Sequence, residues 1–200
     1  LKCQSHSMSI KNMTLESSET FEWIVSHDAL RCVLHPDMLG HGYDARVVVL
    51  GCGNSQLSDG LVASGFTAVT NIDNRWDVIE QMRQRDVAGT MQWQVADVTR
   101  CPEISSGTFQ VGVDKGMLDW FIANDFTIAP LYLWEALRLI IPAGVLVIVS
   151  LHDAEYVRSL LDCPSLPAEI KSQHTLAADV PTGGREGGGG GGGAGGAGGG

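Results

Sequence analysis

The chain has 200 residues, of which 44% are apolar and 18% charged, enough for one globular domain with a hydrophobic core. The formal net charge is −10 without a basic stripe, so no nucleic-acid partner is expected, and no apolar run approaches the ~20 residues that span a bilayer. The five cysteines are odd in number and lack CxxC spacing, which favours reduced thiols in the cytoplasm.

The two ends of the chain differ in composition from its middle. Residues 1–17 are polar and irregular, and we expect a flexible N-terminal segment there. Residues 166–200 end in a glycine-rich sequence that has no side chains to bury, so burial cannot offset the entropy of ordering it. A disordered tail is therefore expected, with the folded domain at residues 18–165.

Between these ends, helical and strand-like segments alternate. The first prediction is a helix, capped by Ser17 or Ser18 and ended by Pro36 and Gly40. A continuous, mostly β-branched run at 45–50 follows, typical of a strand buried on both faces. The later predicted elements are helix 55–64, strand 68–73, helix 75–85 with Trp76, Ile79 and Met82 on one side, strand 91–97, strand 109–114, helices 116–124 and 130–140, strand 144–151 and helix 152–162.

This alternation predicts an α/β fold with a Rossmann-like, doubly wound, mostly parallel sheet. Ligands of such a sheet bind beyond the carboxyl ends of its strands. The first strand ends in glycines at 51 and 53, which allow close approach of a ligand, and the next helix begins near Asn54. Each of the next three strands ends in an aspartate: Asp73, Asp97 and Asp114.

The aspartates have the chemistry to hold a nucleoside. Asp73 lies twenty residues after Gly53, where a carboxylate accepts hydrogen bonds from both ribose hydroxyls. Asp97 can accept a hydrogen bond from an adenine amino group, and Asp114 ends the strand beside the first, near the reacting groups. Each feature alone is also typical of a turn or a helix cap, and only together do they indicate a cofactor site.

Two cofactors must be distinguished. Gln56 replaces the third glycine of a dinucleotide loop, where helix–strand packing normally needs Gly or Ala, and this argues against NAD. S-adenosylmethionine (AdoMet) needs no pyrophosphate cradle, and its ribose, adenine and sulfonium cation suit carboxylates beside a glycine turn. Cys32, His35 and His41 lack zinc-finger spacing and a fourth ligand, so no metal site is expected.

Four segments resemble the class I AdoMet-dependent methyltransferases, and more narrowly the elongation-factor-1A lysine methyltransferase group. They are VVVLGCGNSQLSDGL, NIDNRWDVIEQM, WQVADVT and FQVGVDKGMLDWF, and the resemblance covers about residues 21–152. It implies AdoMet as cofactor and methylation of a lysine in a protein such as a translation elongation factor. The acidic net charge would suit a basic protein as this substrate or a cationic small molecule, and it is equally typical of a protein whose charge only keeps it in solution.

The resemblance also implies roles for single residues. In the cofactor site, Gly51 would lie at the methionine part of AdoMet, Asp73 and Asn74 at ribose and adenine, and Asp97 and Val98 beside the adenine. Lys115 in "DKG" would also lie at the cofactor, and Trp23 in "FEWI" matches an aromatic residue that closes over it. Asp114 is the candidate for orienting the acceptor amine, with Trp120 and Phe121 as possible walls of its channel.

The chain departs from the group in three places. Residues 1–20 lack the group's "YWDxRY"-like segment, and "DKGMLDW" replaces "DKGTLDA", which puts Met117 and Trp120 near the substrate entrance. Beyond Leu151 no β-hairpin is found, so we expect a class I sheet without its final antiparallel hairpin and with an open edge. A truncated, non-catalytic interaction module is an alternative interpretation, and an NAD-type oxidoreductase is a third.

Overall fold

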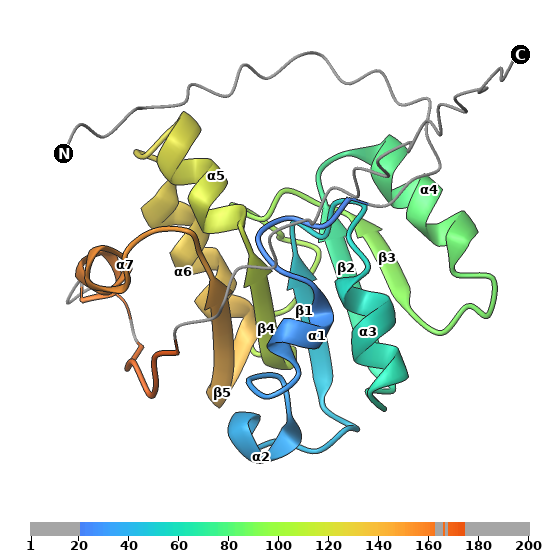
Figure 1. Cartoon of the computed structure of the whole chain (residues 1–200). Helices are drawn as coiled ribbons and strands as arrows, with labels where there is room; N and C mark the ends of the chain where they lie inside the picture. Colours follow the sequence, from blue (N-terminus) through green and yellow to red (C-terminus); the bar gives the residue numbers. More distant parts are fainter. Residues whose placement is uncertain (1–20, 163–165, 167, 175–200) are drawn as a thin grey trace, which may run out of the picture.

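The computed structural model describes residues 21–162, 166 and 168–174. Five parallel strands form one sheet in the order β3-β2-β1-β4-β5 (Figure 1). They are β1 (Arg46–Leu50), β2 (Ala68–Asp73), β3 (Gln92–Val95), β4 (Phe109–Lys115) and β5 (Ile140–Val149). The predicted doubly wound α/β fold is therefore confirmed, and among the described residues no strand follows β5.

Helices cover both faces of the sheet. The helices are α1 (His27–Leu30), α2 (Pro36–Leu39), α3 (Leu57–Ala63), α4 (Trp76–Arg85), α5 (Met117–Asn124), α6 (Ala129–Leu139) and α7 (Ala154–Leu161). Side chains of α1 to α4 pack in one core cluster, and those of α5 and α6 pack in a second cluster on the other face, which α7 also contacts. This is the helix–sheet–helix layering that a doubly wound parallel sheet requires.

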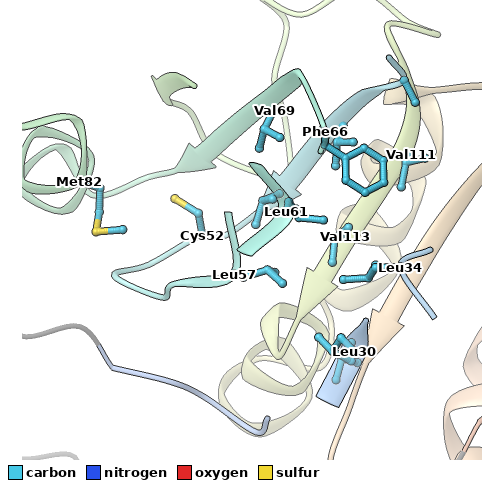
Figure 2. Close-up of a cluster of buried hydrophobic side chains, with 14 of the residues drawn as sticks. Leu30, Leu34, Cys52, Leu57, Leu61, Phe66, Val69, Met82, Val111 and Val113 are labelled. Carbon is cyan, nitrogen blue, oxygen red and sulfur yellow. The ribbon is translucent and has the colours of Figure 1, made fainter. Parts of the chain in front are cut away.

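The central strand β1 shows why both faces must be covered. Val47 and Val49 belong to the first cluster, whereas Val48 and Leu50 belong to the second, because successive side chains of a strand point to opposite faces. Figure 2 shows part of this first cluster, which includes Leu57 and Leu61 of α3, Val111 and Val113 of β4, and Phe66. Each such buried side chain contributes about 1.5–3 kcal/mol to folding.

The predicted first helix is wrong in its extent. Ile24 has a φ of 66°, which no helix accommodates, and helical structure starts only at His27. Pro36 begins the separate helix α2 instead of ending a longer one, since proline suits the first helical turn. Gly40 ends α2 in the left-handed conformation, and the expected caps Ser17 and Ser18 lie outside the described residues.

Two further expectations are corrected. Trp76 is 67% exposed, because as the first residue of α4 it lies beyond the buried face that Val78, Ile79 and Met82 form. The last strand begins at Ile140 rather than at residue 144. The segment between them is a bulge, where Ala143 has a φ of 66° and the pairing of β4 with β5 shifts register.

At the C-terminal side, Leu166 packs in the second cluster, one residue beyond the predicted end of the domain. Residues 1–17 and most of the predicted tail lie outside the described part, so the predicted boundaries stay predictions. No helix within the described residues is long and apolar enough to cross a membrane. In the same part of the chain, no three His, Cys, Asp or Glu side chains are grouped so that they could hold a metal ion.

Candidate cofactor site at the carboxyl edge of the sheet

The strand register aligns the predicted site residues at one edge. Leu50, the last residue of β1, pairs with Ile72 on one side and with Asp114 on the other. One residue further along each strand, Gly51 therefore follows between Asp73 and Lys115. This is the place where the strand order reverses, which is where open α/β sheets bind ligands.

Asp73 is bonded to the glycine turn itself. Its Oδ2 accepts a hydrogen bond from the Gly53 backbone N–H at 2.9 Å, and its Oδ1 accepts one from Arg75 N–H at 2.9 Å. Gly51 and Gly53 have φ values of 63° and 52°, a left-handed conformation that glycine adopts without a Cβ clash. An ionised carboxylate has about four acceptor positions, so Asp73 keeps capacity for ribose hydroxyls.

The third strand ends earlier than predicted. It ends at Val95, and Asp97 lies in the turn beyond it, where its Oδ1 accepts hydrogen bonds from Thr99 N–H at 2.9 Å and Thr99 Oγ1 at 2.7 Å. Val98 is buried, whereas Asn74 is exposed directly after β2. The contacts expected of Asn74, Asp97 and Val98 with an adenosine stay predictions.

Asp114 is fully buried and holds the first turn of α5. Its carboxylate accepts hydrogen bonds from Met117 N–H at 2.7 Å, Leu118 N–H at 3.0 Å and the Tyr132 hydroxyl at 2.8 Å. Burial raises the pKa of Asp114 to about 6, although these three donors lower it. The expected contact with an acceptor amine stays a prediction, and the geometry adds a structural role for this side chain.

Sequence reasoning missed Glu22. Its carboxylate forms an ion pair with Lys115, accepts a hydrogen bond from Ser55 Oγ at 3.2 Å and accepts another from the Gln56 backbone N–H. The Lys115 side chain is only 4% exposed and also donates to the Val25 carbonyl at 3.1 Å. In the sequence, Glu22 was marked only by its position inside "FEWI", beside the aromatic residue Trp23 that the resemblance singled out.

Exposed aromatic side chains lie around this edge. Trp23 is 60% exposed and packs edge-to-face on Phe21, with ring centroids 5.0 Å apart. Trp120 is also exposed, on α5. Phe121 is buried and stacks on Tyr132 at 5.1 Å, so it belongs to the core and does not line a surface channel.

Met117 covers the first glycine of the turn. A Cβ added at Gly51 would collide with the Met117 sulfur and approach its Cγ to 3.1 Å. The departure from "DKGTLDA" therefore lies directly against Gly51, and the side chain at 117 contacts the place where the methionine part of AdoMet is expected.

A separate hollow of about 490 Å³ opens at the opposite edge of the sheet. The amino ends of the strands line it, with Arg46, Thr70, Gln92 and Gln94 among its residues. Neither the glycine turn nor any of the predicted site residues takes part in it. Its size alone does not make it the cofactor site, since the acid and the glycine turn meet at the carboxyl edge.

Known proteins resemble this chain in sequence and in fold. No family model matches the chain. Methyltransferase srdJ of Neurospora crassa is 31% identical over 177 residues, which cover 84% of this chain and 71% of that protein. The PH0226 protein of Pyrococcus horikoshii shares the fold, at a TM-score of 0.51 and 19% identity, over 60% of this chain and 53% of that structure.

Two curated relatives carry names more specific than the srdJ name. The eEF1A lysine and N-terminal methyltransferase of Danio rerio is 33% identical over 70% of this chain and 20% of its own length. EEF1A lysine methyltransferase 4 of Bos taurus is 34% identical over 64% of this chain and 52% of its own length. The chain thus spans about half, or less, of the length of these two relatives.

An acid bonded to a glycine turn at the switch point of a five-stranded parallel sheet is typical of nucleoside-binding α/β proteins, and the extended match to srdJ shows the family of this chain. The chain belongs to the methyltransferase family with the class I, Rossmann-like fold. Within that family, the eEF1A lysine methyltransferases are the group that it resembles.

Proposed function

We propose that this protein binds AdoMet at the carboxyl edge and transfers its methyl group to a lysine of a basic protein, such as a translation elongation factor. One observation carries the proposal most directly: Asp73 accepts a hydrogen bond from the Gly53 N–H, so the acid and the glycine turn form one unit. The relatives named as eEF1A lysine methyltransferases support the acceptor class. Action in the cytoplasm remains part of the same proposal.

The residues at this edge fit the cofactor chemically. Asp73 has acceptor capacity for the ribose hydroxyls. Gly51 has no side chain of its own, but Met117 lies against it, so binding of the methionine part there requires Met117 to change its position. Asn74, Asp97 and Val98 would surround the adenine. Gly53 and Asn54 would contact the cofactor from the glycine turn, and Trp23 would close over the bound molecule. AdoMet supplies an electrophilic methyl group, and the protein's own contribution is to orient donor and acceptor.

The acceptor lysine must be neutral to react, so the site must favour loss of its proton. Asp114 is too deeply buried to approach a substrate without movement of α5, and we propose that it acts by fixing the first turn of that helix. Exposed Trp120 offers an aromatic face to the cationic side chain before it loses its proton. Carboxylates around the edge would attract a basic segment of the substrate.

Cofactor binding is tested by titrating S-adenosylhomocysteine into the protein and following the heat. We expect binding by the unsubstituted chain and at least a tenfold loss of affinity in Asp73→Ala. The substitution removes both the hydrogen bond that holds the glycine turn and the expected contacts with the two ribose hydroxyls. Asp44→Ala, an exposed aspartate before β1, is the matched control. No heat of binding from the unsubstituted protein, or an unchanged affinity in Asp73→Ala, would contradict the proposal.

Methyl transfer is tested by incubating the protein with methyl-labelled AdoMet and a cell lysate. Label in a protein band, located on lysine after digestion, is the expected result, and label in a small molecule instead refutes the acceptor class. Cofactor binding without labelling of any acceptor would instead favour the alternative interpretation, a non-catalytic interaction module.

A further inference from the structure

The residues just before the first helix form a strap across the carboxyl edge. The strap is the segment 21–25, and one of its side chains, Glu22, reaches two separate parts of the candidate site. On one side Glu22 forms the ion pair with Lys115 at the end of β4. On the other side it accepts hydrogen bonds from Ser55 and Gln56, the residues that follow the glycine turn.

Lys115 has little surface left for any other partner. Its side chain is 4% exposed, and it uses its donors on the Glu22 carboxylate and on the Val25 carbonyl at 3.1 Å. A buried ammonium group requires such partners, because a charge removed from water without them is strongly unfavourable. Both partners of Lys115 belong to the strap, so this lysine ties the strap to the sheet.

The backbone of the strap is strained where it bends. Val25 N–H donates to the Trp23 carbonyl at 2.8 Å, which closes a γ-turn around Ile24 at a φ of 66°. A β-branched residue rarely adopts this conformation, and it persists only where surrounding contacts enforce it. The Ile24 side chain packs over Gly116, where an added Cβ would come within 3.2 Å of it.

Trp23 depends on this arrangement for its position. It lies between Glu22 and the strained Ile24, and at 60% exposure it is not held by burial in the core. Its ring packs on Phe21, which is itself a residue of the strap. If Glu22 released Lys115 and the glycine turn, the strained turn could relax and Trp23 would leave the edge.

We propose that Glu22 is a positioning residue of the cofactor site, which fastens the strap to Lys115 and to the glycine turn at once. Lys115 then acts on the cofactor through Glu22 and not by direct contact, in contrast to the role that the family resemblance implies for it. This inference rests on the proposed AdoMet site and adds to it a residue outside the sheet that shapes the pocket.

The test is a double-mutant cycle on the 200-residue chain, with Glu22→Gln, Lys115→Met and the double variant. Glu22→Gln keeps an acceptor for Ser55 and Gln56 but loses the charge that Lys115 requires. Affinity for S-adenosylhomocysteine is measured by calorimetry, and amide hydrogen exchange of residues 23–25 reports the strap. Glu80→Gln, which breaks an exposed ion pair with Arg83 on α4, is the matched control, and thermal melts confirm folding.

We expect each single substitution to weaken binding about tenfold, and the double variant to bind no more weakly than the worse single variant, because both remove one coupled interaction. Faster exchange at residues 23–25 should accompany both. Independent losses that multiply in the double variant, or an affinity of Glu22→Gln equal to that of the control, would overturn the inference.

A third outcome separates this inference from the proposed function. If the unsubstituted protein binds no S-adenosylhomocysteine, the proposed function fails, and the role of Glu22 in the cofactor site fails with it. The exchange measurement still decides whether Glu22 fastens the strap, because unchanged protection at residues 23–25 in Glu22→Gln contradicts that contact as well.

Discussion

At the scale of single residues, buried charge distinguishes the carboxyl edge from the rest of the sheet. Asp114 is fully buried, and the ammonium group of Lys115 is nearly so. Each is surrounded by the donors or acceptors that its charge needs, from segments distant in sequence. Such groups are costly to bury, and their concentration at one edge is typical of a functional site.

The pKa of Asp114 predicts a pH dependence of stability. Its folded-state pKa of about 6 exceeds the ordinary 3.8, so the native protein binds a proton that the unfolded chain has lost between these values. Stability from this group therefore falls as pH rises from about 4 to about 6, by roughly 3 kcal/mol at ~1.4 kcal/mol per pKa unit.

Urea unfolding at several pH values measures this effect, with Asp114→Asn as the comparison. The variant is less stable throughout, because an amide cannot accept from all three donors. The difference in the free energy of unfolding between the two proteins should shrink as pH rises from 4 to 6, because ionisation of the buried carboxyl group lowers the stability of the unsubstituted protein only. A deficit that is constant or grows between pH 4 and 6 contradicts the raised pKa.

The contact of Met117 with Gly51 predicts how an alanine at position 51 changes stability, and a second glycine, Gly89, provides the control. In Gly51→Ala the new Cβ is strained by the positive φ and also collides with Met117. In Gly89→Ala it is strained by a φ of 61° but has open space around it. We expect Gly89→Ala to lower the free energy of unfolding by about 1 kcal/mol and Gly51→Ala to lower it further. Adding Met117→Ala should recover the excess loss, and equal losses in the two glycine variants would show that Met117 does not cover Gly51.

The site residues that sequence reasoning found are those whose signal is local. Asp73 ends a predicted strand at a fixed distance from the glycine turn, and in the structure it accepts a hydrogen bond from that turn. Glu22 has no such signal, because its partners lie 33 residues away at Ser55 and 93 residues away at Lys115. Only the folded chain brings them together.

At the scale of elements, the connection between β3 and β4 has no helix of its own, and α6 stabilises it. Arg138 of α6 donates to the carbonyls of Cys101 and Ile104, each at 2.9 Å, and pairs with Glu135. The Glu135 carboxylate in turn accepts from Cys101 N–H, and its pKa is lowered by the hydrogen bond from Arg138. One guanidinium group thus satisfies several backbone groups of this connection.

Arg138→Lys should therefore destabilise the protein by about 1–3 kcal/mol, because one ammonium group cannot reach both carbonyls and Glu135 together. Arg31→Lys, in an exposed pair with Asp28, is the control and should change stability by less than ~0.5 kcal/mol. Both are measured by urea unfolding. A loss in Arg138→Lys no larger than in the control would mean that the connection is held by other contacts.

The regular elements were predictable because their patterns are strong over their own length. The β-branched run of β1 and the apolar side of α4 needed no knowledge of distant residues. The prediction of the first helix was wrong because tertiary contacts outweigh the helix propensity of its first residues: Ile24 has a positive φ and packs over Gly116. The bulge at Ala143 was also missed, since Pro142 and Gly144 are equally typical of a loop.

At the scale of the whole molecule, the net charge of −10 predicts how the acceptor is recruited. If a basic protein is the acceptor, its KM should rise with salt, as the Debye length falls from ~30 Å at low ionic strength to ~3 Å near 1 M. S-adenosylhomocysteine lacks the sulfonium cation, so its affinity should change much less. An acceptor KM that is independent of salt would contradict charge-driven recruitment.

The two edges of the sheet offer alternative places for a ligand, and the proposed function requires that the cofactor binds at the carboxyl edge. Amide chemical shifts recorded while S-adenosylhomocysteine is added to the labelled protein decide between them. We predict the largest shifts at Gly51, Gly53 and Asn74, at the carboxyl edge. Absence of shifts at saturating ligand, or shifts confined to Thr70 and Gln92 around the opposite hollow, would contradict the assignment of the cofactor site.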